Sequence, residues 1–192
     1  MPTALRADAA RNRERLIEAA GRVFATQGLD AGVDEIARTA GVGIGTLYRR
    51  FPTRDELVGA VLDDTFERVL ARLNEAATDP DPWTALERAI GGFAEAVLAN
   101  RALLHSTAHD GCHAERVGGL KRQLLERFDA ILERAQAAGV VRGDVIPGDL
   151  MALSGMLSRI PPQRLERDPQ VWRRWLALML DGLRPEGAHP LP

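Results

Sequence analysis

Apolar residues recur three and four positions apart through most of this chain, and runs that alternate apolar and polar residues are almost absent. The first spacing places side chains on one face of an α-helix, whereas a strand with one buried face needs the alternation. The chain is therefore predicted to be all-α. Its 192 residues, 45% of them hydrophobic, are enough to form a buried core.

Glycines, prolines and capping residues divide this pattern into separate helices. Gly28, Gly41 and Gly139 each follow an apolar stripe, where a helix often ends in the left-handed conformation. The "TRDE" stretch at residues 53–56 resembles a capping box, and Asp81 before Pro82 is typical of a helix start. The expected helices cover residues 8–27, 33–40, 43–51, 53–77, 81–99, 101–109, 114–138, 148–160 and 169–183.

Two breaks indicate how these helices are grouped. The "TDPDP" stretch at residues 78–82 is expected to be a hinge between modules, and the two prolines of "PPQRLERD" are expected to enforce the break between the last two helices. We predict an N-terminal three-helix domain at residues 1–52, a larger helical domain at residues 53–185 and a disordered tail at residues 186–192.

The stretch from Val33 to Phe51 has the spacing of a helix-turn-helix, with a short helix, a glycine turn and a second short helix. Ala37 is small where the two helices would cross closely, and Gly41 lies where the backbone must turn with a positive φ. Val42 and Leu47 are expected to hold the second helix against the first. A side chain larger than alanine at position 37 should spread the pair.

The other faces of this second helix suit a nucleic acid. Glycines at a helix start let the backbone N–H groups approach a phosphate, and Ile44 and Thr46 can meet base edges in a major groove. Tyr48, Arg49 and Arg50 can bind the sugar-phosphate backbone. The simpler alternative is that the glycines only join two core helices and that the arginines form a solvated face.

From about Arg11 to Val61 the chain resembles the DNA-binding domain of the TetR family of transcriptional regulators, through "AAGRVFATQGLDAGVDEIARTAGVGIGTLYRRFPTRDEL". The resemblance implies that the third helix reads double-stranded operator DNA and that Tyr48 and Arg54 contact phosphates. Serine or threonine commonly caps that helix in the family, so Gly43 lacks one hydroxyl contact. The candidate DNA-binding residues are Val33, Gly43, Ile44, Gly45, Thr46, Tyr48, Arg49, Arg50 and Arg54.

The same resemblance implies that the fourth to seventh helices enclose an inducer pocket. An ordinary apolar core is the alternative, because apolar residues at helical spacing usually pack inward. The "HSTAHDGCH" stretch contains His105, His109, Cys112 and His113, which are possible metal ligands, but Gly111 separates them and a polar pocket wall is favoured over a metal site. The candidate pocket residues are Phe66, Trp83, Phe93, Leu103, His105, His109, Leu124 and Phe128.

The last two helices are expected to pair with a second copy of the chain. The resemblance implies this homodimer, and the apolar stripes of "LMALSGMLSRI" and "VWRRWLALML" favour it independently. Packing inside one chain is the alternative for such stripes. The candidate interface residues are Leu150, Leu153, Met156, Leu157, Val171, Trp175, Leu178 and Met179.

Several classes of protein are not supported by the sequence. The single Cys112 excludes an internal disulfide and fits a reducing, cytoplasmic location, and no secretion signal or membrane span is expected. We find no nucleophile elbow, phosphate-binding loop or paired carboxylates, so no enzyme, cofactor or metal is predicted.

The sequence therefore predicts a sequence-specific DNA-binding transcriptional regulator. We expect a homodimeric repressor that an unidentified small-molecule inducer releases from its operator. Two alternatives stay open at this point. One is a helical adaptor module that binds a protein partner, and the other is a transcriptional activator with the same DNA-binding domain.

Overall fold

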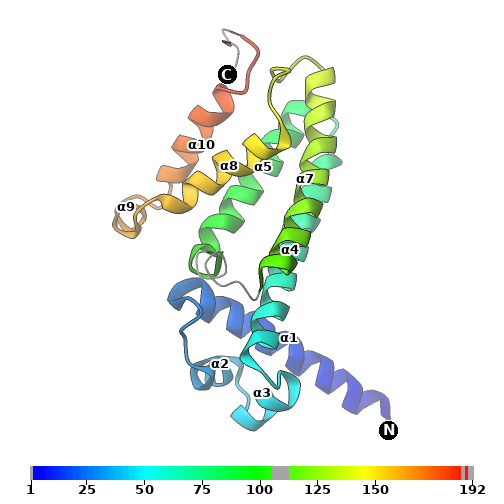
Figure 1. Cartoon of the computed structure of the whole chain (residues 1–192), viewed down its shortest axis with the longest axis vertical. Helices are drawn as coiled ribbons and strands as arrows, with labels where there is room; N and C mark the ends of the chain where they lie inside the picture. Colours follow the sequence, from blue (N-terminus) through cyan, green and yellow to red (C-terminus); the bar gives the residue numbers. More distant parts are fainter. Residues whose placement is uncertain (1, 105–112, 187–188, 190–192) are drawn as a thin grey trace. The chain divides into compact units, whose positions relative to one another are not determined.

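The computed structural model describes residues 2–104, 113–186 and 189 of the chain (Figure 1). Every regular element in this part of the chain is a helix, and none is a strand, so the all-α prediction is confirmed. The chain divides into two compact units. The first unit contains Met1–Glu67 and Asn100–Gly118, and the second contains Arg68–Ala99 and Gly119–Pro192.

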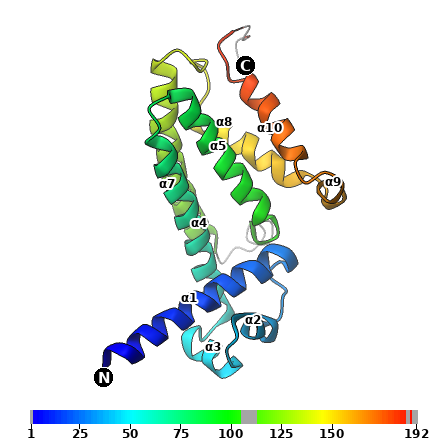
Figure 2. The same cartoon turned by 180° about the vertical axis from the view of Figure 1, so that it is seen from behind.

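The first unit is built on α1 (Pro2–Gln27), α2 (Val33–Ala40), α3 (Ile44–Arg50) and the beginning of α4 (Arg54–Ala77). α1 packs against α2, and α2 packs against α3 (Figures 1 and 2). Their inward faces carry the apolar stripes of the sequence. The core of this unit includes Leu16, Ala20, Phe24, Ile36, Ala37, Leu47, Phe51, Leu57, Val61 and Leu62.

The second unit contains the rest of α4, with α5 (Pro82–Ala99), most of α7 (Ala114–Ala137) and the C-terminal helices. The Phe93 ring on α5 meets the Phe128 ring on α7 edge to face, with centroids 5.4 Å apart. α5 also packs against α8 (Pro147–Met156), η2 (Leu157–Arg159) and α10 (Val171–Asp181). The C-terminal helices are α8 (Pro147–Met156), the 3-10 turn η2 (Leu157–Arg159), α9 (Pro162–Arg167) and α10 (Val171–Asp181).

Most helix ends lie within one residue of the predicted positions, because local signals mark them. Gly28, Gly41 and Gly139 have φ values of 75°, 68° and 70°, the left-handed conformation expected at these helix ends. The first helix is longer than predicted and begins at residue 2 instead of 8. Of the predicted helix at residues 101–109, residues 101–104 are helical and the remainder lies outside the described residues.

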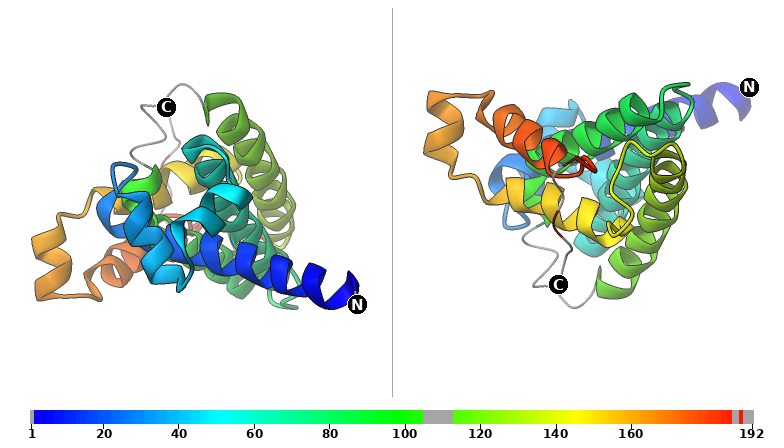
Figure 3. Two further views of the ribbon diagram at one scale, coloured as in Figure 1. Left: turned by 90° about the horizontal axis from the view of Figure 1, so that it is seen from below. Right: turned by 90° about the horizontal axis from the view of Figure 1, so that it is seen from above.

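Residues 161–168 separate the last two predicted helices, but they also contain a short helix that the sequence did not predict, α9. Proline is well accepted in the first turn of a helix, where its missing N–H would have no partner, so Pro162 begins α9 instead of preventing it. Both views of Figure 3 show α9 projecting where the chain passes from α8 to α10. The predicted helix at residues 148–160 is correspondingly divided into α8 and η2.

The connection between α4 and α5 is not the predicted hinge, because both of its flanks belong to the second unit. The Arg134 guanidinium donates to the carbonyl oxygens of Ala77 and Asp79 at 2.9 and 2.7 Å. The Asp81 carboxylate accepts the Thr84 N–H at 2.7 Å and caps α5, as the sequence predicted. These bonds fix the path of the connection.

Candidate DNA-binding surface

The turn between α2 and α3 is held by Gly41. Its φ of 68° and ψ of 32° reverse the chain, and its N–H donates to the end of α2. The next N–H, of Val42, donates to the Ala37 carbonyl oxygen at 3.0 Å. This pattern of bonds satisfies carbonyl groups that the end of a helix would leave without partners.

One face of α3 is buried and the opposite face is open to solvent. Leu47 is 1% exposed and meets the core beside Ile36 and Ala37 of α2, which are 0% and 3% exposed. On the open side, Ile44 is 41% exposed and Tyr48 is 46% exposed. Both side chains are therefore accessible to a partner. The seven α3-region candidates therefore lie around one short helix.

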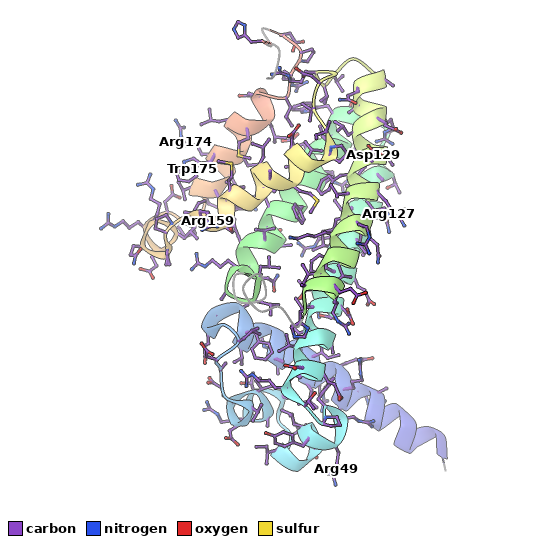
Figure 4. The ribbon with its side chains drawn as sticks, in the orientation of Figure 1. Arg49, Arg127, Asp129, Arg159, Arg174 and Trp175 are labelled. Carbon is purple, nitrogen blue, oxygen red and sulfur yellow. The ribbon has the colours of Figure 1, made fainter. Side chains whose placement is uncertain are left out.

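The polar residues of α3 extend this exposed surface. Arg49 and Arg50 are exposed at the end of the helix, and Arg49 is seen at the free edge of α3 in Figure 4. The Arg49 guanidinium donates to Thr46 Oγ1 at 3.1 Å, one turn earlier on the helix. Gly43 adopts φ −71° and ψ 147° at the start of α3. Val33, the remaining candidate on α2, is half-buried.

The end of α3 is anchored by Phe51, through contacts that the sequence did not reveal. Phe51 is 4% exposed, and its N–H donates to the Leu47 carbonyl oxygen at 2.8 Å. The Arg13 guanidinium carbon of α1 lies 5.6 Å from the centroid of the Phe51 ring, within cation–π range. The sequence shows an aromatic residue, Phe51, before Pro52. It could not show the Arg13 contact, because Arg13 lies in another helix.

Arg54 differs from the other candidates because its side chain faces the protein. Its Nη2 atom donates to the carbonyl oxygens of Leu29 and Ala31, the latter at 2.6 Å. Its guanidinium carbon also lies 5.6 Å from the centroid of the Phe24 ring. The structure thus separates Arg54, half-buried against the loop between α1 and α2, from the exposed residues of α3.

The candidate pocket residues are divided between the units. Phe66 and Leu103 are buried in the first unit, and Phe93, Leu124 and Phe128 are buried in the second. Trp83 of the second unit is half-buried, with the Arg184 guanidinium carbon 3.3 Å from its ring centroid. His105 and His109 lie outside the described residues. Within the described part of the chain these side chains form apolar cores.

The second unit also has a surface groove of about 440 Å³ between α4, α5 and α10. Its rim carries ion pairs in which Arg72 and Arg173 each approach Glu95 at 3.6 Å. None of the six described pocket candidates lines this groove. Among the described residues, no group of three or more histidines, cysteines or acidic residues is arranged to hold a metal ion, and Cys112 lies outside them.

The candidate interface residues also fall into two groups. Leu150, Leu157 and Val171 are at most 2% exposed and belong to the core of the second unit. Leu153 and Met179 are half-buried. Met156 of α8 is 65% exposed, and Trp175 and Leu178 of α10 are 39% and 62% exposed. Figure 4 shows Trp175 on α10. These three exposed apolar side chains, on α8 and α10, are left largely uncovered by the described part of the chain.

A short helix, a glycine turn and a second helix with an exposed cationic face define a helix-turn-helix DNA-binding protein. Family models agree with this class. Residues 16–61 match the model of the bacterial regulatory proteins of the tetR family, and residues 81–185 match the SbtR-like transcriptional regulator C-terminal domain. The chain belongs to the TetR family, and it is a DNA-binding transcriptional regulator.

Solved structures and curated relatives support the same assignment. The TetR transcription regulatory protein of Mycobacterium vanbaalenii is 35% identical, with a TM-score of 0.72 over 94% of this chain and 99% of that one. The regulator SCO0520 of Streptomyces coelicolor is 32% identical, with a TM-score of 0.69 over 91% of this chain and 99% of that one.

Two curated relatives are mycobacterial proteins. The HTH-type transcriptional regulator Mb2274c of Mycobacterium bovis is 30% identical over 79% of each chain. The regulator Rv1816 of Mycobacterium tuberculosis is 32% identical over 68% of this chain, which spans 58% of that relative. No described helix of the present chain combines the length and apolar character needed to cross a membrane.

Proposed function

We propose that the protein is a homodimeric repressor that binds a two-fold symmetric operator and leaves it when a small molecule binds. The observation that carries the proposal is the exposed face of α3, where Ile44 and Tyr48 stand beside Arg49 and Arg50. A helix of this kind reads base edges in the major groove, while its cations bind phosphates. The site of action is the cytoplasm, where a bacterial regulator meets its DNA.

The homodimer is supported by the apolar surface of Met156, Trp175 and Leu178. A two-fold symmetric protein places two copies of α3 on half-sites separated by one DNA turn, about 34–36 Å, or a small multiple of it. Pairing through these side chains would remove apolar area from water and fix that separation. A small molecule that binds one arrangement of the dimer more tightly would shift the population away from the operator-bound one.

The inducer is proposed to bind in the helical second unit, whose apolar interior includes Phe93, Leu124 and Phe128. α4 contributes residues to both units, from Arg54 near the DNA-binding surface to Ala77. A change in the direction of this helix on ligand binding would alter the separation of the two copies of α3. Equal affinity of an inducer for the free and the operator-bound protein would refute this mechanism.

DNA binding is tested by fluorescence anisotropy with a duplex selected from random double-stranded DNA by the wild-type protein. Tyr48→Ala and Arg49→Ala should each weaken binding by about tenfold, since each removes contacts of roughly 1–3 kcal/mol. Helicity measured by circular dichroism should not change, because both side chains are exposed. Glu87→Ala, on the exposed surface of α5, is the control. Unchanged affinity in both α3 variants would overturn the proposal for this face.

Repressor and activator are separated by transcription in vitro from a promoter that carries the selected duplex. Repression on addition of the protein supports the proposal, and stimulation identifies the activator. A protein partner in place of DNA is excluded if binding weakens steeply with salt, because several phosphate contacts release counterions.

A further inference from the structure

We infer that Arg54 is a positioning residue that fixes the loop before α2, and that it does not act as a phosphate contact. The inference concerns the DNA-binding function of the chain and reverses the role that the family resemblance implies for this position. It rests on the direction of one side chain. The Arg54 Nη2 atom donates to two main-chain carbonyl oxygens, those of Leu29 and Ala31.

The two carbonyl groups belong to a segment with few bonds of its own. Gly28 ends α1 with a φ of 75°, and its carbonyl oxygen accepts a long 3.5 Å bond from the Ala31 N–H. Ala31 is 6% exposed, so its carbonyl group is close to the core. A main-chain carbonyl group near the core costs free energy unless it has a partner. Arg54 supplies that partner for two residues at once.

The start of α2 has no side-chain cap of its own. Gly32 occupies the N-cap position with φ −69° and ψ 140°, and a glycine has no side chain to accept an N–H. On the exposed side of this region, Gln27 Nε2 of α1 donates to Glu35 Oε1 of α2 at 3.1 Å. Arg54 therefore ties the first residue of α4 to the entrance of the helix-turn-helix.

The shape of the arginine side chain also matters. Its flat guanidinium group lies near the Phe24 ring, with the Cζ atom 5.6 Å from the ring centroid. A lysine at this position would keep the positive charge, but its side chain is shorter and has no flat face for the ring. A residue that only needed to meet a phosphate could be either of the two. Arginine is better suited than lysine to bind two carbonyl groups while its flat face lies near an aromatic ring.

Contact of the Arg54 Nη2 atom with a phosphate would require these bonds to break. A guanidinium directed at Leu29 and Ala31 presents its Nη2 donors to the protein, whereas Arg50 on α3 is exposed and makes no such main-chain bond in the described residues. Loss of Arg54 should therefore weaken specific binding by disturbing the placement of α2 and α3. Loss of a phosphate contact would weaken binding to every DNA sequence alike.

The test compares Arg54→Gln with the matched charge-neutralising variant Arg50→Gln, and adds Arg54→Lys. Anisotropy is measured on the duplex selected by the wild-type protein and on a scrambled duplex, each at several salt concentrations. For Arg54→Gln we expect specific affinity to fall by about tenfold, the size of a lost charged hydrogen bond. Affinity for the scrambled duplex and its salt slope should stay at the wild-type values. Arg54→Lys should fail to restore specific affinity.

Arg50→Gln should behave in the opposite way, with a loss on both duplexes and a salt slope about 0.9 smaller, as expected for one phosphate. If Arg54→Gln shows this second pattern, or if Arg54→Lys binds like the wild type, the inference is overturned and Arg54 is a phosphate contact.

Hydrogen exchange of the free protein gives an arm that needs no DNA. Amide exchange of residues 29–36 should accelerate by about tenfold or more in Arg54→Lys, while exchange in the middle of α1 stays at the wild-type rate. Unchanged exchange at residues 29–36 would overturn the inference. The exchange measurement can be made even if no duplex is selected. Failure to select a duplex would count against the proposed sequence-specific function, and it would not count against the role of Arg54.

Discussion

At the scale of single residues, Gly41 and Gly43 look alike in sequence but have different backbone requirements. A Cβ atom added to either glycine would meet no atom within 4 Å. Gly41 has a φ of 68°, whereas Gly43 has a φ of −71°, which any residue can adopt. The turn therefore requires glycine only at position 41, and the missing hydroxyl at position 43 is not imposed by the fold.

Gly41→Ala should lower the free energy of unfolding by about 1–2 kcal/mol, the cost of a left-handed conformation for a residue with a Cβ. Gly43→Ser should leave it unchanged or raise it by about a few tenths of a kcal/mol, because serine is a slightly better N-cap. Urea unfolding followed by circular dichroism measures both variants. Equal effects of the two changes would contradict the role assigned to the φ of Gly41.

The sequence could indicate Gly41 because the spacing of a helix-turn-helix is local. It could not indicate the direction of the Arg54 side chain, whose acceptors Leu29 and Ala31 belong to a different helix connection. The contact of Arg13 with Phe51 was missed for the same reason. The exposed positions of α3 were predicted as a set, and their individual contacts with DNA remain predictions.

At the scale of elements, the start of α5 shows how a cap depends on charge. Hydrogen bonds from the Thr84 side chain and N–H hold the pKa of the Asp81 carboxyl below its ordinary value of 3.8. A group whose pKa is lower in the folded protein stabilises the fold above its unfolded pKa and loses that contribution as the pH falls through the folded pKa. The cap is therefore fully effective near neutral pH.

Asp81→Ala should unfold at a lower urea concentration than the wild type at pH 7, and the gap between the two proteins should narrow below about pH 4. Asp81→Asn keeps an oxygen that accepts the Thr84 N–H and does not titrate, so its loss of stability should be smaller and nearly independent of pH. Unfolding curves at several pH values provide the comparison. If the difference in stability between Asp81→Ala and the wild type grows as the pH falls, the charged Asp81 carboxylate does not stabilise the start of α5.

The limits of most elements were readable because a cap, a glycine or a proline marks each end. α9 was missed because proline has opposite effects at different positions. It disrupts the interior of a helix, but it is favoured in the first turn, where Pro162 lies. The connection at residues 78–82 was misjudged as a hinge because the guanidinium of Arg134, which fixes it, comes from α7. Local sequence patterns contain no information about such a partner.

At the scale of the whole molecule, the last helices carry both core and surface residues on similar stripes. The sequence could find the stripes but not divide them, since their division depends on how α8 and α10 pack against α5. The structure buries Leu150, Leu157 and Val171 and leaves Leu178 62% exposed. Assembly with a second copy is therefore best tested on the exposed group.

Leu178→Glu should convert the dimer to monomers, because it places a charge within the apolar surface that we propose to be covered. The matched control Ala177→Glu adds the same charge at the neighbouring exposed position of α10, on a different side of the helix, and should stay dimeric. Sedimentation equilibrium of both variants and the wild type gives the masses. If the wild type and both variants have the same dimer dissociation constant, the interface lies elsewhere on the molecule.

The aromatic residues of this chain also divide it spectroscopically. All three tryptophans, at positions 83, 172 and 175, belong to the second unit, while the single tyrosine is Tyr48 on α3. Indole emission therefore reports on the second unit alone, and tyrosine emission comes only from α3, the helix that we propose to bind DNA. Transitions recorded in the two bands would coincide if the units melt together and separate if they do not. The chain thus carries a native optical label for each unit.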